Sequence, residues 1–143
     1  MKNSKKILLA SLLIAAEYST LASAHTQSGA LGISTSGAAA TDVYVVTCGL
    51  GSARLFLRVI DLAPVLSPSI SIQAAKANRA SALAVDVVDG DANYSTAVVL
   101  ARGAGTYQMT VNKPASTSKG QELYKAEFHA RIAQAIIPKR TWV

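Results

Sequence analysis

The sequence predicts an antiparallel β-sandwich of seven or eight short strands that follows a cleaved signal peptide. Short segments rich in β-branched and aromatic residues recur along the chain, and several of them alternate apolar and polar residues. Turn residues separate these segments every eight to fifteen positions, as in sandwich domains. No amphipathic helical stripe lies between them, which argues against an α/β fold. A closed barrel with a similar number of strands has the same periodicity and remains an alternative.

Residues 1–24 have the parts of a secretory signal peptide. Three lysines stand in the first six residues, the apolar run 7–16 follows, and residues 22–24 are the Ala-Ser-Ala that signal peptidase accepts. The run is too short for a membrane span, which needs about 20 apolar residues. We therefore expect cleavage before His25, no membrane span afterwards, and a periplasmic or extracellular protein.

The 119 residues after the predicted cleavage site fit one domain. Residues 25–40 are mostly Gly, Ser, Thr and Ala, and we expect a flexible arm with one short strand near 30–34. The sandwich is predicted over residues 41–129, and residues 130–143 form an atypical tail. Residues 25–130 carry eight Lys and Arg against seven Asp and Glu, a balance that gives no electrostatic reason to expect nucleic-acid binding.

The first two strands of the predicted sandwich form a hairpin. Residues 42–48 are β-branched and aromatic, and Gly49 begins a turn into residues 53–61. In that second strand Leu55, Leu57 and Val59 share one fully apolar face.

The later strands are marked by alternation and by the turns between them. Residues 69–73 alternate strictly after a proline, and residues 106–111 place apolar side chains on one face. A turn over residues 89–93 and a Ser/Thr-rich loop over 114–120 separate others. The further strands are predicted at 69–74, 83–88, 97–101, 106–111 and 122–129.

His25 is the sharpest candidate metal ligand. A histidine at a new N-terminus offers its α-amino nitrogen and an imidazole nitrogen, a pair that chelates copper(II). His129 on the last predicted strand would supply a second imidazole, giving a three-nitrogen histidine brace. The plainer interpretation is a solvent-exposed histidine on a poorly ordered arm.

An acidic turn offers a second candidate site, for calcium. Asp89, Asp91 and Asn93 have the spacing that opens a calcium loop, and Asp86 precedes them. Tyr94 stands where an EF-hand needs glycine, and position 100 is Leu rather than the bidentate Glu. We therefore consider a calcium site that is not an EF-hand, against the alternative of a plain acidic turn.

Cys48 is the single cysteine of the chain. Thiols of exported domains tend to pair, so Cys48 is either a buried small apolar residue or a cysteine whose partner is missing. A dyad with His129 is conceivable, but a thiol in the apolar strand 43–48 is normally inert. No Gly-x-Ser-x-Gly motif is present. We expect no catalytic residues.

The order of segments resembles the small exported β-sandwiches of the bacterial pre-peptidase C-terminal (PPC) type. The matching pieces are Thr41-Asp42-x-Tyr44, the strand from Ala53 to Val59, the Asp89-Gly90-Asp91 turn, Gly105-Thr106-Tyr107-x-Met109-x-Val111, and a final strand with Tyr124. The resemblance implies an accessory module without a catalytic site, found beside secreted enzymes or alone.

The sequence is also similar to exported bacterial proteins whose last strand ends Phe-His-Cys and whose tail carries another His. Here Phe128-His129 is followed by Ala130. Codons chosen for the tail, when read one nucleotide earlier, can encode a Cys directly after His129 and a His further on. That resemblance suggests the hypothesis that the tail from Ala130 arose by a frameshift and that the lost cysteine paired with Cys48.

These observations predict an exported, non-catalytic accessory or binding β-sandwich with an unknown protein or glycan as its partner. The alternative from another class is a copper-binding protein that uses His25 and His129. No cofactor is expected beyond the copper or calcium named above.

Overall fold

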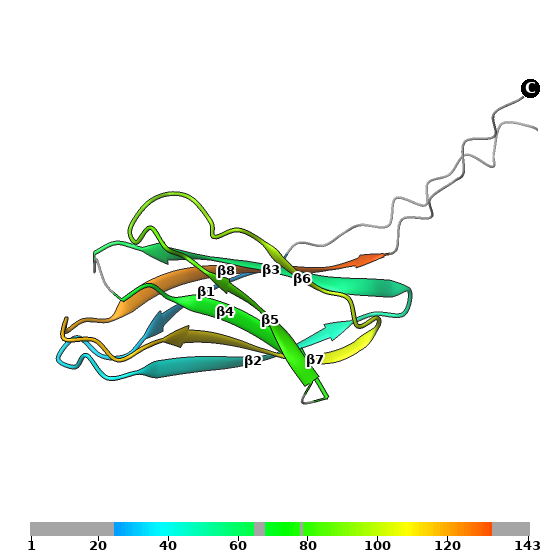
Figure 1. Ribbon diagram of the computed structural model, residues 1–143, viewed down its shortest axis with the longest axis horizontal. Coiled ribbons are helices and arrows are strands. Elements are labelled where there is room, and N and C mark those ends of the chain that lie inside the picture. Colours follow the sequence, from blue (N-terminus) through cyan, green and yellow to red (C-terminus); the bar gives the residue numbers. More distant parts are fainter. Residues whose placement is uncertain (1–24, 65–67, 78, 133–143) are drawn as a thin grey trace, which may run out of the picture.

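The computed structural model describes residues 25–64, 68–77 and 79–132 (Figure 1). This part of the chain contains eight strands and no helix, and therefore no helix that could cross a membrane. The strands are β1 His25–Leu31, β2 Ala40–Cys48, β3 Ser52–Leu62, β4 Ser71–Lys76, β5 Arg79–Val85, β6 Val98–Leu100, β7 Gly105–Lys113 and β8 Glu122–Ile132.

The strands form two antiparallel sheets of four, which confirms the predicted β-sandwich. The first sheet has the order β1-β8-β3-β6 and the second has the order β2-β7-β4-β5 (Figure 1). Both sheets are open at their edges, so the barrel alternative does not apply. The centre of the first sheet is the long pairing of β3 with β8, which runs from Leu62 opposite Leu123 to Ser52 opposite Ile132.

The N-terminal arm differs from the expectation, because residues 25–31 form the complete edge strand β1. Each residue of β1 is paired with β8, from His25 opposite Phe128 to Leu31 opposite Glu122. Of these seven side chains, that of Leu31 is the one classed as buried. An edge strand held by main-chain hydrogen bonds needs little apolar alternation, so the Gly- and Ser-containing sequence indicated only a short strand near residues 30–34.

The last strand extends three residues beyond the predicted end of the sandwich at His129. Ala130 lies opposite Leu55 and packs against the core, while Arg131 is exposed. The predicted signal peptide and residues 133–143 of the tail lie outside the described residues. The first three residues of the proposed frameshifted tail therefore belong to the sheet.

The core lies between the sheets and follows the alternation of the sequence. Leu55, Leu57 and Val59 of β3 face Tyr107, Met109 and Val111 of β7, and all six side chains are fully buried. Cys48 at the end of β2 is buried in the same cluster, and this burial raises the pKa of its thiol. Within this structure Cys48 is thus a small apolar core residue.

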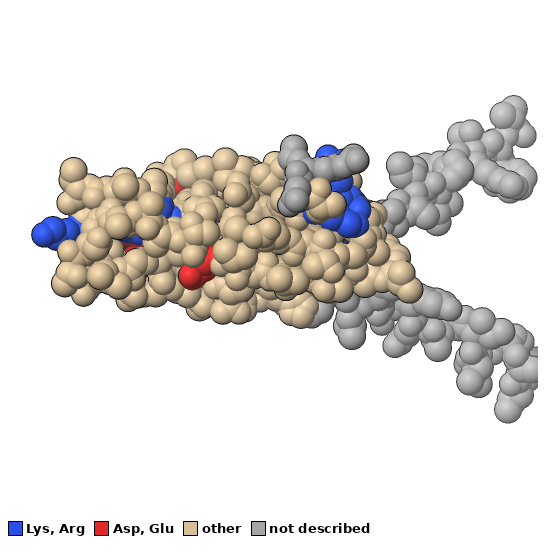
Figure 2. Space-filling model, turned by 90° about the horizontal axis from the view of Figure 1, so that it is seen from below, with Lys and Arg blue, Asp and Glu red and all other residues tan. Residues whose placement is uncertain are grey.

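The outer faces of the two sheets differ in charge. The outer face of the first sheet carries Arg58, Lys125 and Glu127 beside His129. Figure 2 looks at the molecule from the side of the second sheet, and almost all of that surface is uncharged. Its outward residues on β2, β7 and β4 are Thr41, Val43, Val45 and Thr47; Thr106, Gln108, Thr110 and Asn112; and Ser71, Gln73 and Ala75.

Candidate functional site

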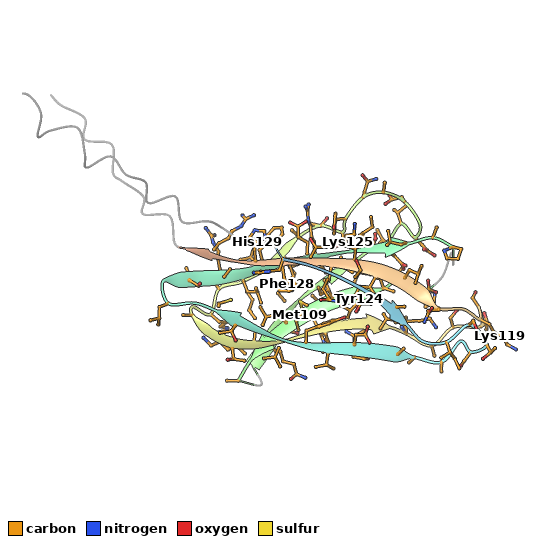
Figure 3. The ribbon with its side chains drawn as sticks, turned by 180° about the vertical axis from the view of Figure 1, so that it is seen from behind. Met109, Lys119, Tyr124, Lys125, Phe128 and His129 are labelled. Carbon is orange, nitrogen blue, oxygen red and sulfur yellow. The ribbon has the colours of Figure 1, made fainter. Side chains whose placement is uncertain are left out.

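The two histidines predicted to bind copper project from opposite faces of the first sheet, His25 from β1 and His129 from β8. His25 is paired with Phe128, and their rings stack with centroids 5.6 Å apart. Phe128 packs against the core, whereas the adjacent His129 projects to the outer face and stacks on Phe56 at 4.4 Å (Figure 3). Successive side chains of a strand point to opposite faces, so this pairing does not bring the two imidazoles together.

Neighbouring side chains on the outer face lie beside both ring nitrogens of His129. Its Nε2 accepts a hydrogen bond of 2.8 Å from Nε of Arg131, and its Nδ1 lies 4.0 Å from Glu127. Burial lowers the pKa of His129, and the positive charge of Arg131 lowers it further. Cys48 lies in the core on the second sheet, so the conceivable Cys48–His129 dyad would have to reach through the first sheet.

The acidic residues predicted to bind calcium lie in the loop 86–97, which connects β5 of one sheet to β6 of the other (Figure 1). The buried Asp86 accepts a hydrogen bond of 2.7 Å from the backbone N–H of Asp61. Asp91 accepts two hydrogen bonds from Asn93, at 2.6 Å and 3.0 Å. The four predicted residues therefore do not converge on one point.

Asp86, Asp91 and Asn93 instead line an open pocket of about 260 Å³ on this loop. The hydroxyl of the buried Ser95 anchors the loop, because it accepts a hydrogen bond of 3.1 Å from Val59 N–H. All the polar residues that line the pocket belong to this loop: Asp86, Asp91, Asn93, Tyr94, Ser95 and Thr96.

Asp89, the fourth residue, belongs to a different group of acidic side chains. One carboxylate oxygen from each of Asp89, Asp61 and Glu122 lies within 4.8 Å of the other two. Asp61 comes from β3, Glu122 opens β8, and both are fully buried between the sheets. Three segments that are far apart in sequence thus form one carboxylate cluster.

Burial and neighbouring carboxylates raise the pKa values of all three acidic groups. Burial is the main cause for Asp61, and Asp89 and Glu122 add to it, so that its pKa rises to about 7. The amide of Ile70 partly opposes this shift. Burial likewise raises the pKa values of Asp89 and Glu122, with Asp86 adding to the first and Asp89 to the second.

Asp61 and Glu122 were not among the residues predicted from sequence, although alternation contained a signal for Asp61. In β3 this residue continues the series Leu55, Leu57 and Val59, so it stands on the apolar face of the strand. A charged residue on a buried face is the unusual observation, and it marks a candidate site.

No protein-family model matches this chain, and no curated protein is significantly similar to it. The resemblance to PPC-type sandwiches therefore stays a prediction.

Proposed function

We propose that this chain is an exported, non-catalytic binding module that holds a neutral glycan in the pocket of the loop 86–97. The observation that carries the proposal is the combination of groups at the pocket: Asp86 and Asp91, the amide of Asn93, the hydroxyl of Thr96 and the ring of Tyr94. A few placed polar groups with an apolar or aromatic surface are typical of small-ligand sites.

The chemistry of the pocket favours a polyhydroxylated, uncharged ligand. Carboxylates accept hydrogen bonds from hydroxyl groups, an amide both donates and accepts them, and an aromatic ring packs against the C–H face of a sugar. The two aspartates would repel phosphates, sulfates and uronic acids, because like charges oppose association. The volume of about 260 Å³ is slightly below the usual range of ligand pockets, so the pocket would hold only a short segment of a glycan chain.

The surroundings of the pocket support a binding role. Tyr94 is held by the guanidinium of Arg58, which lies 4.3 Å from the ring centroid. Arg58 is itself fixed by Glu127 through hydrogen bonds of 2.9 Å and 2.6 Å. The loop is thus mounted on two central strands, as binding loops on rigid sheets commonly are. The predicted signal peptide and the PPC-type resemblance favour a module that accompanies secreted enzymes.

The test is calorimetric titration of the purified protein with soluble neutral hexasaccharides of β-linked glucose, mannose and N-acetylglucosamine. We expect at least one of them to bind. We expect Asn93→Ala and Thr96→Val each to weaken that binding at least about tenfold, the effect of losing one or two hydrogen bonds in a binding site.

The matched control is Val45→Lys, which changes the outer face of the second sheet and leaves the loop intact. Val45 is 75% exposed, so the lysine should not disturb the fold. The proposal is overturned if none of the three sugars binds. It is also overturned if Val45→Lys abolishes binding while the loop variants do not.

A further inference from the structure

The carboxylate cluster of Asp61, Asp89 and Glu122 lacks the hydrogen bonds that buried acidic groups normally have. None of its six carboxylate oxygens has a hydrogen-bond partner of ordinary geometry within the described residues. Asp61 and Glu122 are each 0% exposed. Unpaired buried carboxylates are strongly destabilising, so native structures pair them or coordinate them to a metal.

Protein cations do not neutralise the cluster. Among the described side chains, no lysine or arginine lies within 4.0 Å of any of the three carboxylates. Lys113 is buried nearby and lowers the pKa of Glu122 through its charge. Its amino group, however, donates a hydrogen bond of 3.2 Å to the carbonyl of Ala38. Among the described side chains, Lys113 thus offsets the charge of Glu122 in part and forms no ion pair with the cluster.

The arrangement of the cluster suits a cation. The three side chains come from β3, from the loop and from the start of β8, and one oxygen from each converges within 4.8 Å. The loop is fixed to β3 at this point, because Asp86 accepts the backbone hydrogen bond of Asp61. This hydrogen bond between Asp86 and the backbone of Asp61 therefore fixes the loop beside β3 without using the carboxylates of the cluster.

The donor set favours calcium among the divalent cations. All the donors are oxygens, whereas zinc and copper prefer nitrogen and sulfur ligands. Three carboxylates can offer up to six oxygens, and calcium takes six to eight in flexible geometry. Magnesium keeps several waters and demands a near-octahedral shell, which a buried cluster of this kind does not provide.

We propose that Asp61, Asp89 and Glu122 bind one calcium ion, which ties the loop 86–97 to the adjacent ends of β3 and β8. This site differs from the calcium site expected from sequence, with which it shares Asp89. It does not depend on the proposed glycan function, and its test uses no glycan.

The test is calorimetric titration of the chelator-treated protein with calcium at pH 8, together with thermal melts with and without the ion. We expect one site per chain and a higher melting temperature with calcium, since an ion that binds only the folded state stabilises it. Magnesium at the same concentration should give a smaller rise. No binding at millimolar calcium overturns the proposal, and a larger response to magnesium overturns the choice of ion.

The variants Asp61→Asn and Glu122→Gln locate the site. Each removes one charge and keeps the shape, so we expect calcium affinity to fall at least about 100-fold. Without calcium both variants should melt at or above the temperature of the chelator-treated wild type, because repulsion within the cluster is relieved. This second readout separates loss of the site from loss of the fold.

Asp91→Asn is the matched control, because this acidic residue lies on the same loop but outside the cluster. It should retain one calcium site and the full rise in melting temperature. If Asp91→Asn abolishes calcium binding while Asp61→Asn does not, the ion lies at the outer turn and the proposal fails.

Discussion

Tyr124 on β8 donates a hydrogen bond of 2.6 Å to Oδ2 of Asp42 on β2 and so joins the two sheets of the sandwich. Because its proton goes to Asp42, Tyr124 accepts the hydrogen bond of Tyr44, also on β2. Figure 3 shows Tyr124 directed from its strand into the interior. Burial and the hydrogen bond donated to Asp42 raise the pKa of Tyr124. The core thus contains a polar connection between its two layers.

We expect Tyr124→Phe to lower the free energy of unfolding by about 1–3 kcal/mol, because it leaves Asp42 and Tyr44 without their common partner. Tyr44→Phe keeps the bond between Tyr124 and Asp42, so it should have the smaller effect. Urea unfolding at pH 7 measures both. Equal stability of Tyr124→Phe and the wild type would show that the connection contributes nothing.

Gly29 should be intolerant of any side chain. It lies opposite Tyr124 on the neighbouring strand, and a Cβ at this position would overlap the tyrosine ring and hydroxyl. The ring has no freedom to withdraw, because its hydroxyl is held at β2. We expect Gly29→Ala to destabilise the protein by about 1–3 kcal/mol. Gly49→Ala is the control, since a Cβ there meets no atom within 4 Å. A thermal melt in which both variants behave alike would contradict this packing.

We expect His129 to destabilise the folded protein in mild acid. Its pKa is lowered from 6.5 in the folded state, by burial first and then by Arg131, while Glu127 opposes and Arg58 assists the shift. The unfolded chain therefore binds a proton below about pH 6.5 that the folded chain does not take up, so the contribution of His129 to stability falls as the pH drops through this window. The raised pKa of Asp61 acts in the opposite direction over the same range, so the comparison is with the variant: between pH 7.5 and 5, urea unfolding should show the stability of the wild type falling relative to that of His129→Gln. Identical slopes for the two proteins would refute the assignment.

The frameshift hypothesis predicts that Ala130→Cys forms a disulfide with Cys48. Both positions face the space between the sheets, Ala130 from β8 and Cys48 from β2. We expect no free thiol after oxidation and a gain of about 2–4 kcal/mol over the reduced form. Arg131→Cys serves as the control, since that residue is exposed and should leave both thiols titratable. Two free thiols in oxidised Ala130→Cys would argue against the pairing that the frameshift hypothesis supposes.

The strands that alternate clearly were the predictable part of the fold. The predicted ranges 42–48, 53–61, 106–111 and 122–129 lie within β2, β3, β7 and β8. The first was marked by its β-branched and aromatic residues, and the others by apolar residues at every second position. Half-buried strands of this kind reveal both their existence and their inward face.

The strand predicted at 83–88 begins and ends a few residues after the observed strand β5, Arg79–Val85. β5 ends at Val85, and Val87 and Val88 are exposed in the loop. The cause is a set of hydrogen bonds that no apolar pattern encodes: Asp86 N–H bonds to Ile70, and the Asp86 carboxylate accepts Asp61 N–H. These bonds turn the chain towards the other sheet.

The carboxylate cluster was only partly predictable. Asp89 could be named because it lies in a recognisable turn, but its partners lie far away in sequence and meet it through sheet pairing. Alternation could place Asp61 on a buried face. It could not show that β8 would bring Glu122 to the same end of the sandwich.

The position of β8 also sets the order of assembly. This strand lies between β1 and β3, so the first sheet has no central strand to join them until residues 122–132 have been synthesised. Whether the chain emerges from a ribosome or from a translocation pore, β1 and β3 emerge before β8 and cannot complete the first sheet without it. A chain halted earlier would leave the edges of β1 and β3 unpaired, and such edges are what chaperones bind and what seeds aggregation.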